Sequence, residues 1–323
     1  MSEPVRTGVV GVGTMGRHHA RLYRELPDTR LVGVADADAE RAARVAEEYD
    51  TVAYDRDALL AEVDAVSVAV PTPYHAEVAD AAMDAGTHLL VEKPFVEDAA
   101  TGEALVERAD REGLVLQVGH VERFNPAVVA LADIVPDLDL VAVTADRLGP
   151  PLDRRVDDGV VLDLMIHDID VLLSLVDGPL ERVEASGTDD GQYATAVLTF
   201  ESGVVATLTA SRVTQEKVRA LSLTARQCQV NVDYGDQSVE IHRHSLPEYI
   251  VNNGDVRYRH ESITEHPTVE NGEPLRAELS AFAEAVRTGG DPVVSGRDGL
   301  RALAVAEEIL DAVAAPDAEV TLP

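Results

Sequence analysis

Glu92-Lys93-Pro94 is the first group in this sequence whose residue types could do chemistry, and it follows an apolar stretch, residues 88–91, that predicts a strand. The chain has two lysines, Lys93 and Lys217, against 25 arginines. A lysine kept where arginine is otherwise preferred favours a functional role, because a lysine ammonium is compact and can lose its proton, which arginine cannot do. Lys93 is therefore a candidate for stabilising a developing negative charge or for accepting a proton.

A second group lies on residues 160–176, an apolar stretch that predicts a helix; its polar residues are Asp163, His167, Asp168, Asp170 and Ser174. At 100° per residue, positions 163, 167, 170 and 174 form one narrow stripe. Asp168 lies off this stripe, and we expect it to be a structural or surface residue. A narrow polar stripe indicates either a buried helix that lines a cavity or polar side chains that hydrogen-bond within the core.

A glycine-rich motif, GVGTMG at residues 11–16, lies between a predicted strand and a predicted helix, as a dinucleotide-binding loop requires. Gly11 would permit the tight turn, Gly13 the approach of a pyrophosphate, and Gly16 close packing of helix on strand. The next predicted strand ends in Asp36, whose carboxylate could accept both hydroxyls of a ribose and would repel a 2′-phosphate. NAD is therefore favoured over NADP, and Arg41, the nearby basic residue, is expected to be a solvated helix residue.

The elements that must position these residues fall into two patterns. Strands at residues 7–10, 31–35, 65–70, 88–91 and 114–118 alternate with helices at 17–26, 38–49, 74–85 and 98–112, which predicts a parallel sheet covered on both faces. After the helix at 160–176, strands are expected at 182–186, 193–200, 204–211, 218–224, 229–232 and 238–241, then helices at 275–287 and 298–314. We expect an α/β Rossmann domain over residues 1–121 and, over residues 122–323, an α+β domain with a large, mostly antiparallel open sheet.

Composition limits the partners of this chain. Its 323 residues carry a formal net charge of −32, and a duplex-binding protein needs a basic face, so no nucleic-acid partner is expected. No apolar run approaches a membrane span and the N-terminus lacks a secretory pattern, so we expect a cytoplasmic protein without membrane contact. No metal site is expected, since no Cys/His cluster has zinc-ligand spacing. The acid-rich, lysine-poor, tryptophan-free composition resembles cytosolic proteins of salt-in halophiles, in which salt screens self-repulsion.

The motifs together resemble the glucose–fructose oxidoreductase/inositol dehydrogenase family. GxGxxG at Gly11–Gly16, Pro71-Thr72-Pro73 with His75, Glu92-Lys93-Pro94, and Asp163 four residues before His167 occur in that family's order and spacing. The resemblance implies an active site of Lys93, Asp163 and His167, a cis peptide before Pro94, and dimers or tetramers assembled through the C-terminal sheet. It implies a cofactor site made of Gly11, Gly13, Thr14, Met15, Gly16, Asp36, Pro71, Thr72, His75, Glu92 and Lys93.

The residue types suit oxidation of a secondary alcohol, in which hydride leaves to a nicotinamide and a proton leaves to a base. His167 suits the base because histidine ordinarily titrates near neutral pH. Asp163 could orient it or hold a neighbouring hydroxyl, while Lys93 stabilises the alkoxide. A neutral Lys93 is the alternative base, and the sequence does not separate the two assignments.

Two further segments resemble the branch of the family that oxidises the 3-hydroxyl of UDP-N-acetylglucosamine. They are GHVERFNP at residues 119–126 and the cationic run SRVTQEKVR at residues 211–219. The expected substrate-binding residues are His120, Arg123, Asn125, Arg212 and Lys217, the last two with Arg219 near a diphosphate. For the cationic run, a charged edge strand is an equal alternative. Rival functions are an inositol or free-sugar dehydrogenase and a non-catalytic cofactor-binding regulator.

Overall fold

The computed structural model describes residues 3–151, 159–188, 190–244, 248–252, 255–259 and 262–315. The chain forms two compact units. The first comprises Met1–Phe124 and Gly272–Ala304, and the second comprises Asn125–Asn271 and the chain from Val305 onward. The sequence predicts a single division of the chain, after residue 121. In the structure, residues 272–304 also belong to the first unit.

The first unit is built on a six-stranded parallel sheet in the order β3-β2-β1-β4-β5-β6. Its strands are β1 (Val5–Val10), β2 (Thr29–Ala35), β3 (Val52–Ala53), β4 (Ala65–Val68), β5 (His88–Glu92) and β6 (Leu116–Gly119). Its helices are α1 (Thr14–Glu25), α2 (Ala39–Glu48), α3 (Arg56–Leu60), α4 (His75–Asp84), α5 (Ala99–Glu112), α8 (Pro274–Thr288) and the start of α9 (Gly296–Ala314), with short 3₁₀ turns η1 (Thr72–Tyr74) and η2 (Val121–Phe124). The Rossmann prediction is confirmed, although the short β3 and α3 were not predicted.

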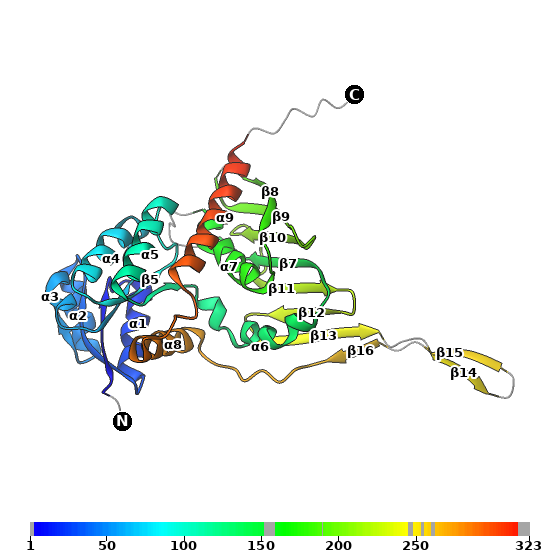
Figure 1. Cartoon of the computed structure of the whole chain (residues 1–323), viewed down its shortest axis with the longest axis horizontal. Helices are drawn as coiled ribbons and strands as arrows, with labels where there is room; N and C mark the ends of the chain where they lie inside the picture. Colours follow the sequence, from blue (N-terminus) through cyan, green and yellow to red (C-terminus); the bar gives the residue numbers. More distant parts are fainter. Residues whose placement is uncertain are drawn as a thin grey trace. The chain divides into compact units, whose positions relative to one another are not determined.

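Apolar side chains on both faces hold this sheet in place. All four residues of β4 are buried, as expected for a central parallel strand with helices on either side. One core cluster joins α1, α2 and α8 to the sheet, and its α8 members include Leu279 and Phe282, both fully buried. Residues 272–304 therefore complete a hydrophobic face that the first 124 residues leave open, with α8 beside α1 (Figure 1).

The second unit contains an eight-stranded sheet in the order β16-β13-β12-β11-β7-β10-β9-β8. Its strands are β7 (Leu140–Leu148), β8 (Leu180–Gly187), β9 (Tyr193–Phe200), β10 (Val205–Ser211), β11 (Val218–Ala225), β12 (Cys228–Asp233), β13 (Ser238–His244) and β16 (Ser262–Glu265), and β14 (Glu248–Asn252) pairs with β15 (Asp255–Arg259). Its helical segments are α6 (Pro126–Ile134), η3 (Val135–Asp137), η4 (Val161–Met165), α7 (Ile166–Leu175) and the end of α9. Every strand pair is antiparallel except β7 with β10, so the predicted open sheet is confirmed.

Strand β7 and helix α6 are the main elements of this unit that were not predicted. Along β7 the buried residues alternate as Val143, Ala145 and Arg147, and the arginine at the third inward position breaks an otherwise apolar pattern. Helix α6 begins at Pro126 after Asn125, whose side chain accepts the Ala127 N–H and caps the helix. Asparagine followed by proline is a known helix start signal, so α6 could have been predicted.

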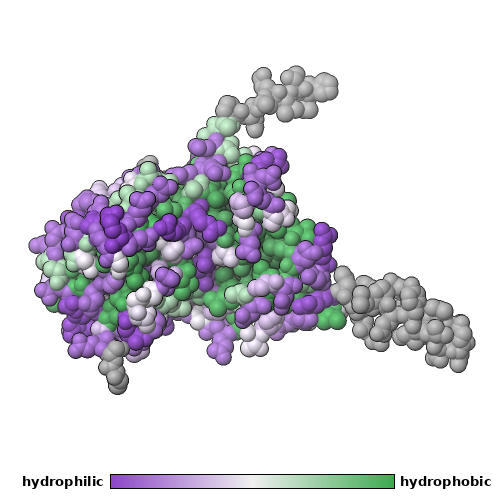
Figure 2. All heavy atoms as spheres, viewed as in Figure 1, coloured by the Kyte–Doolittle hydropathy of each residue, from purple (hydrophilic) through white to green (hydrophobic). Residues whose placement is uncertain are grey.

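Hydrophilic residues cover much of the face seen in Figure 2, in keeping with the many acidic side chains of the chain. Within the described residues, no helix is both long enough and apolar enough to span a membrane.

Candidate active site

The glycine loop between β1 and α1 has the geometry that a bound pyrophosphate requires. Gly11 has φ +88°, and a Cβ on it would lie 2.6 Å from the Ala69 carbonyl oxygen. A Cβ on Gly16 would lie 1.8 Å from the Gly11 oxygen, so α1 packs on β1 only with glycine there. A Cβ on Gly13 would meet nothing within 4 Å, which leaves open space in front of the start of α1. Neighbouring Thr14 and Met15 are exposed at that helix terminus, whose N–H groups attract anions.

Asp36 lies beside this loop with its carboxylate held in one orientation. Its Oδ2 accepts the Val12 N–H at 2.8 Å, and its Oδ1 accepts the Asp38 N–H at 2.8 Å. It helps to line a cavity of about 880 Å³ that also includes Gly11, Gly13 and Pro71. Arg41 lines the same cavity, 3.4 Å from Asp36, so it is not simply the solvated residue that we expected. Glycine loop, helix terminus and oriented carboxylate together fit a dinucleotide.

Lys93 follows β5 at the carboxyl edge of the sheet, where ligands of such folds bind. The Lys93–Pro94 peptide is cis. The Lys93 backbone N–H donates to Glu92 Oε2 at 3.3 Å, while Glu92 Oε1 lies 3.0 Å from Nε2 of fully buried His19. Glu92, expected to bind cofactor, therefore contacts protein groups on both oxygens. Sequence reasoning missed His19, although a histidine on the buried side of an amphipathic helix is a recognisable signal.

His75, also expected at the cofactor site, is buried and contacts backbone carbonyls through both ring nitrogens. Its Nδ1 lies 2.9 Å from the Pro94 oxygen, and its Nε2 lies 2.8 Å from the Val70 oxygen. Among the other residues expected there, Pro71 is exposed and Thr72 is half-buried in the 3₁₀ turn that precedes α4. Pro71 and Thr72 are thus accessible to a ligand, whereas His75 supports the loops behind them.

His120 follows β6 and brings a buried imidazole close to two cations of the same unit. Burial, then the charge of Lys93, then that of Arg123, lowers the pKa of His120 to about 3, while Asp298 opposes this shift weakly. His120 is therefore neutral at any physiological pH. The first unit thus gathers three predicted site residues, Lys93, His120 and Arg123, at the carboxyl ends of β5 and β6.

In the second unit, Asp163 and His167 occupy one continuous helical segment, as predicted, but the segment is not a regular α-helix throughout. Residues Val161–Met165 form a π-helix that contains Asp163, and α7 begins at Ile166. Single π-turns inside helices occur frequently at functional sites. Arg212 donates to the Asp163 carboxylate, and the arginine side chain is 4% exposed. Arg212 is therefore a partner of Asp163, and its charge is already compensated within the protein.

Asp168 is a structural residue, and it lies in the core of the second unit, not on its surface. Arg147 donates to both of its oxygens, from Nε at 2.7 Å and from Nη2 at 2.8 Å. The guanidinium also lies 5.3 Å from the ring centre of Tyr234. Asn125, expected to bind substrate, uses its oxygen to cap α6 and donates its amide to the Tyr234 carbonyl at 3.1 Å. Both ends of that side chain thus serve the fold, and Arg147 and Tyr234 are residues that sequence reasoning missed.

The three basic residues of the cationic run at 211–219 have different surroundings in the structure. Arg212 pairs with Asp163, and Arg219 donates from Nη1 to the Leu148 carbonyl at 2.6 Å. Lys217 is exposed in the loop between β10 and β11. Of these three residues, Lys217 is the most exposed. Across the described residues no cluster of His, Cys, Asp and Glu could hold a metal ion.

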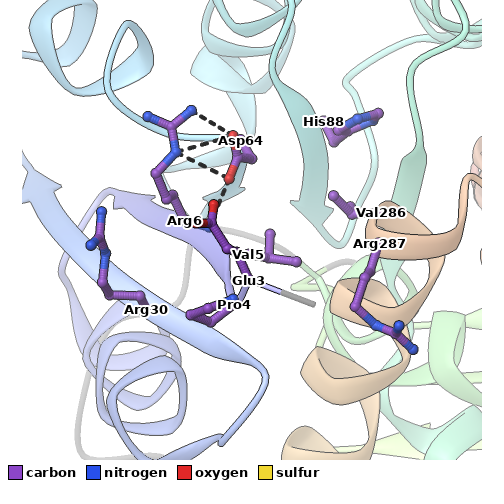
Figure 3. Close-up of a pocket in the computed structure, with 9 residues that line it drawn as sticks. All are labelled: Glu3, Pro4, Val5, Arg6, Arg30, Asp64, His88, Val286 and Arg287. Atoms are coloured by element: carbon purple, nitrogen blue, oxygen red, sulfur yellow. Dashed lines mark hydrogen bonds and ion pairs between the residues drawn. The ribbon is translucent and has the colours of Figure 1, made fainter. Parts of the chain in front are cut away.

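A different pocket lies at the opposite, amino-terminal edge of the parallel sheet (Figure 3). It measures about 760 Å³, and Arg6, Asp64 and His88 line it. Arg6 donates to Asp64 at 2.6 Å, so those two charges compensate each other. The pocket lies away from the carboxyl ends of the strands and holds none of the predicted site residues, so we do not assign the active site to it.

Comparison with known proteins agrees with this geometry. Residues 5–120 match the profile of an oxidoreductase family with an NAD-binding Rossmann fold, and residues 140–242 match the GFO/IDH/MocA C-terminal domain. The chain is 38% identical over 316 residues to UDP-N-acetylglucosamine 3-dehydrogenase from Acidithiobacillus ferrooxidans, covering 96% of this chain and 98% of that protein.

Two further similarities extend the comparison. A solved structure of the Acidithiobacillus ferrooxidans dehydrogenase superimposes with a TM-score of 0.88 at 37% identity, covering 97% of this chain and 98% of the other. Inositol 2-dehydrogenase from Rhizobium meliloti is 29% identical over 329 residues, covering 96% of this chain and 97% of that protein.

Proposed function

The chain belongs to the GFO/IDH/MocA family of NAD-binding oxidoreductases, and from that premise we propose that it oxidises the 3-hydroxyl of UDP-N-acetylglucosamine. The observation that carries this proposal is the 38% identity, over nearly the full length of both chains, to a dehydrogenase named for that reaction. The segment GHVERFNP supports it, because its His120 lies close enough to Lys93 and Arg123 for both charges to lower the pKa of the imidazole. An intact Lys93, Asp163 and His167 favour an enzyme over a non-catalytic regulator.

NAD supplies the hydride acceptor when bound, so the secondary alcohol becomes a ketone and releases one proton. We assign Lys93 to stabilising the alkoxide that develops as the C–H bond breaks. His167 accepts the hydroxyl proton, and Asp163, held by Arg212, fixes the base or a neighbouring hydroxyl. His120 takes no part as an acid, because its imidazole is already neutral. We assign Arg123 to contact with the substrate, because its segment GHVERFNP follows the carboxyl end of β6.

The diphosphate of the substrate needs local positive charge, which is scarce in a chain of net charge −32. We assign Lys217 to this contact, because it is exposed whereas Arg212 and Arg219 contact groups within the protein. A charged contact far from the reacting carbon contributes binding energy that orients the sugar. In concentrated salt such contacts act at short range.

We further propose roles for the two units and for the sheet. Residues 1–121, with the returning residues 272–304, would bind the dinucleotide, while the remainder of residues 122–323 would bind the sugar. The face of the eight-stranded sheet that carries half-buried Thr195 and Thr207 would join copies into a homodimer or homotetramer. A cytoplasmic location and adaptation to high salt are part of the same proposal.

The test is to incubate the protein with NAD and UDP-N-acetylglucosamine at low salt and at molar salt. The expected result is NADH with an equal amount of a 3-keto sugar, trapped by an aminotransferase as the 3-amino sugar. The relationship to inositol 2-dehydrogenase makes free inositol the informative competitor. If inositol or glucose turns over far faster than the nucleotide sugar, the protein is a free-polyol dehydrogenase. Binding of NAD without turnover of any of these would favour a regulator.

A further inference from the structure

His75 connects two loops at the carboxyl edge of the Rossmann sheet. It is the first residue of α4 and is 1% exposed. Its Nδ1 lies 2.9 Å from the Pro94 oxygen and 3.2 Å from the Phe95 oxygen. Its Nε2 lies 2.8 Å from the oxygen of Val70, just beyond the end of β4. One ring thus contacts the loop after β4 and the two residues that follow Lys93.

The other side of Lys93 is held independently. Its backbone N–H donates to Glu92, whose carboxylate in turn contacts His19 on α1. The carboxyl group of Glu92 also lies 3.1 Å from where a Cβ on Gly119 would be, so β6 leaves it little room to move. Lys93 is therefore flanked by two anchored segments, while its own side chain is only half-buried. Glu92 holds the backbone of Lys93 itself, whereas His75 contacts the backbone of Pro94 and Phe95, the two residues after Lys93.

We propose that His75 is a positioning residue for Lys93. Its Nδ1–H donates to the Pro94 carbonyl, holds the segment that follows Lys93, and so determines where the lysine side chain leaves the end of β5. A positioned ammonium matters because displacement of a catalytic group by about 1 Å can lower turnover by roughly 100-fold. The effect on turnover rests on the proposed role of Lys93, whereas the structural effect on Lys93 does not.

Two substitutions separate the contacts of the ring. The amide of Asn reaches the position of histidine Nδ1, and the amide of Gln reaches that of Nε2. His75→Asn can therefore keep a donor toward Pro94 and lose the contact to Val70, while His75→Gln does the reverse. His88→Gln is the matched control, because His88 begins the same strand β5 at its opposite end and accepts the Val115 N–H at 2.9 Å.

The two lysines of the chain make the position of Lys93 directly observable. Reductive methylation with ¹³C-formaldehyde labels Lys93, Lys217 and the N-terminal amine, and a Lys217→Arg sample assigns the signals. The spectrum of each variant is recorded without substrate, alongside its thermal unfolding. We expect His75→Gln to shift the Lys93 signal, and His75→Asn and His88→Gln to leave it nearly unchanged.

In the enzyme assay, His75→Gln should lower kcat by about 10-fold or more with KM for NAD unchanged, and His75→Asn should stay within about 3-fold. An unchanged Lys93 signal in His75→Gln overturns the proposal. The proposal is also overturned if the Lys93 signal shifts equally in His75→Asn and His75→Gln and both variants lose thermal stability, because that result indicates a structural role only. The Lys93 signal can also respond as expected while neither the parent protein nor any variant oxidises the nucleotide sugar. In that case the positioning role stands and the proposed function fails.

Discussion

Arg212 donates a hydrogen bond to the Asp163 carboxylate across 49 positions of sequence, from a side chain that is 4% exposed. This pairing changes the expected effect of removing the arginine. Arg212→Ala leaves a half-buried carboxylate without its cation, so we expect kcat to fall by about 10- to 100-fold with little change in KM for the nucleotide sugar.

Steady-state kinetics of Arg212→Ala beside Lys217→Ala check this assignment. The lysine variant should raise KM several-fold and leave kcat near the parent value. If Arg212→Ala raises KM alone, the arginine contacts substrate and its pairing with Asp163 is incidental.

Asp36 is expected to decide cofactor choice. Asp36→Ala removes the acceptor for the ribose hydroxyls, and a charged hydrogen bond of this kind contributes about 1.5–3 kcal/mol, so NAD should bind roughly 10- to 100-fold more weakly. The same change releases Arg41, 3.4 Å away, to approach a 2′-phosphate, so discrimination against NADP should relax. Fluorescence titration with NADH and NADPH measures both effects.

The double variant Asp36→Ala/Arg41→Ala is the control, and it should lose the gain for NADPH. Equal affinity of the parent protein for both cofactors would contradict the preference for NAD.

Lys93 is expected to serve chemistry and not folding, because its side chain is half-buried at the carboxyl edge of the sheet. Lys93→Met should lower turnover by about 100-fold or more, as the loss of an electrostatic stabiliser does, with Tm and NAD affinity nearly unchanged. His167→Asn should also suppress turnover. If His167 is the base, the residual activity of its variant loses its dependence on pH near neutrality. A fully active Lys93→Met would remove the lysine from the mechanism.

His120 should make the fold sensitive to acid. Its pKa is lowered to about 3 in the folded protein, against about 6.5 for a histidine in an unfolded chain. Between these values the unfolded chain binds one more proton, so the free energy of unfolding falls as the pH falls, by about 1.4 kcal/mol per pH unit well below 6.5. The free energy of unfolding is measured by urea titration at several pH values from 7 to 5, at constant salt. Plotted against pH, it should change less steeply in His120→Gln than in the parent, by the amount that corresponds to about one proton. Parallel curves for the two proteins would show that the folded His120 is accessible to protons.

The pair of Arg147 and Asp168 should matter for stability. Both side chains are nearly fully buried, at 5% and 3% exposure, so removing one partner leaves an uncompensated charge. Asp168→Ala should cost about 3–5 kcal/mol in the free energy of unfolding, measured by urea titration. Replacing both residues with apolar ones, as in Arg147→Met/Asp168→Leu, should cost clearly less. An equal cost for the single and the double variant would mean that packing, and not charge, explains the loss.

Local patterns in the sequence determined most of the first unit and the cofactor loop. Alternating apolar strands and amphipathic helices repeat over short distances, and the predicted element ends agree with the structure to within three residues. The glycine motif and Asp36 could be assigned because each acts through its own backbone geometry or through the end of its own strand. Thus the fold class and the dinucleotide site follow from residues that are near one another in the chain.

Only the tertiary structure decided which polar side chains are already satisfied within the protein. His19 with Glu92, Arg147 with Asp168 and Arg212 with Asp163 are paired across 73, 21 and 49 positions, and no local pattern reveals such a partner. A buried charge needs a counter-charge, but the sequence does not say from which element it comes. The return of residues 272–304 to the first unit has the same origin, because an apolar helix face is covered by whichever distant segment fits it. Sequence therefore determined the types of group available for chemistry, and long-range packing decided which of them remain available to a ligand.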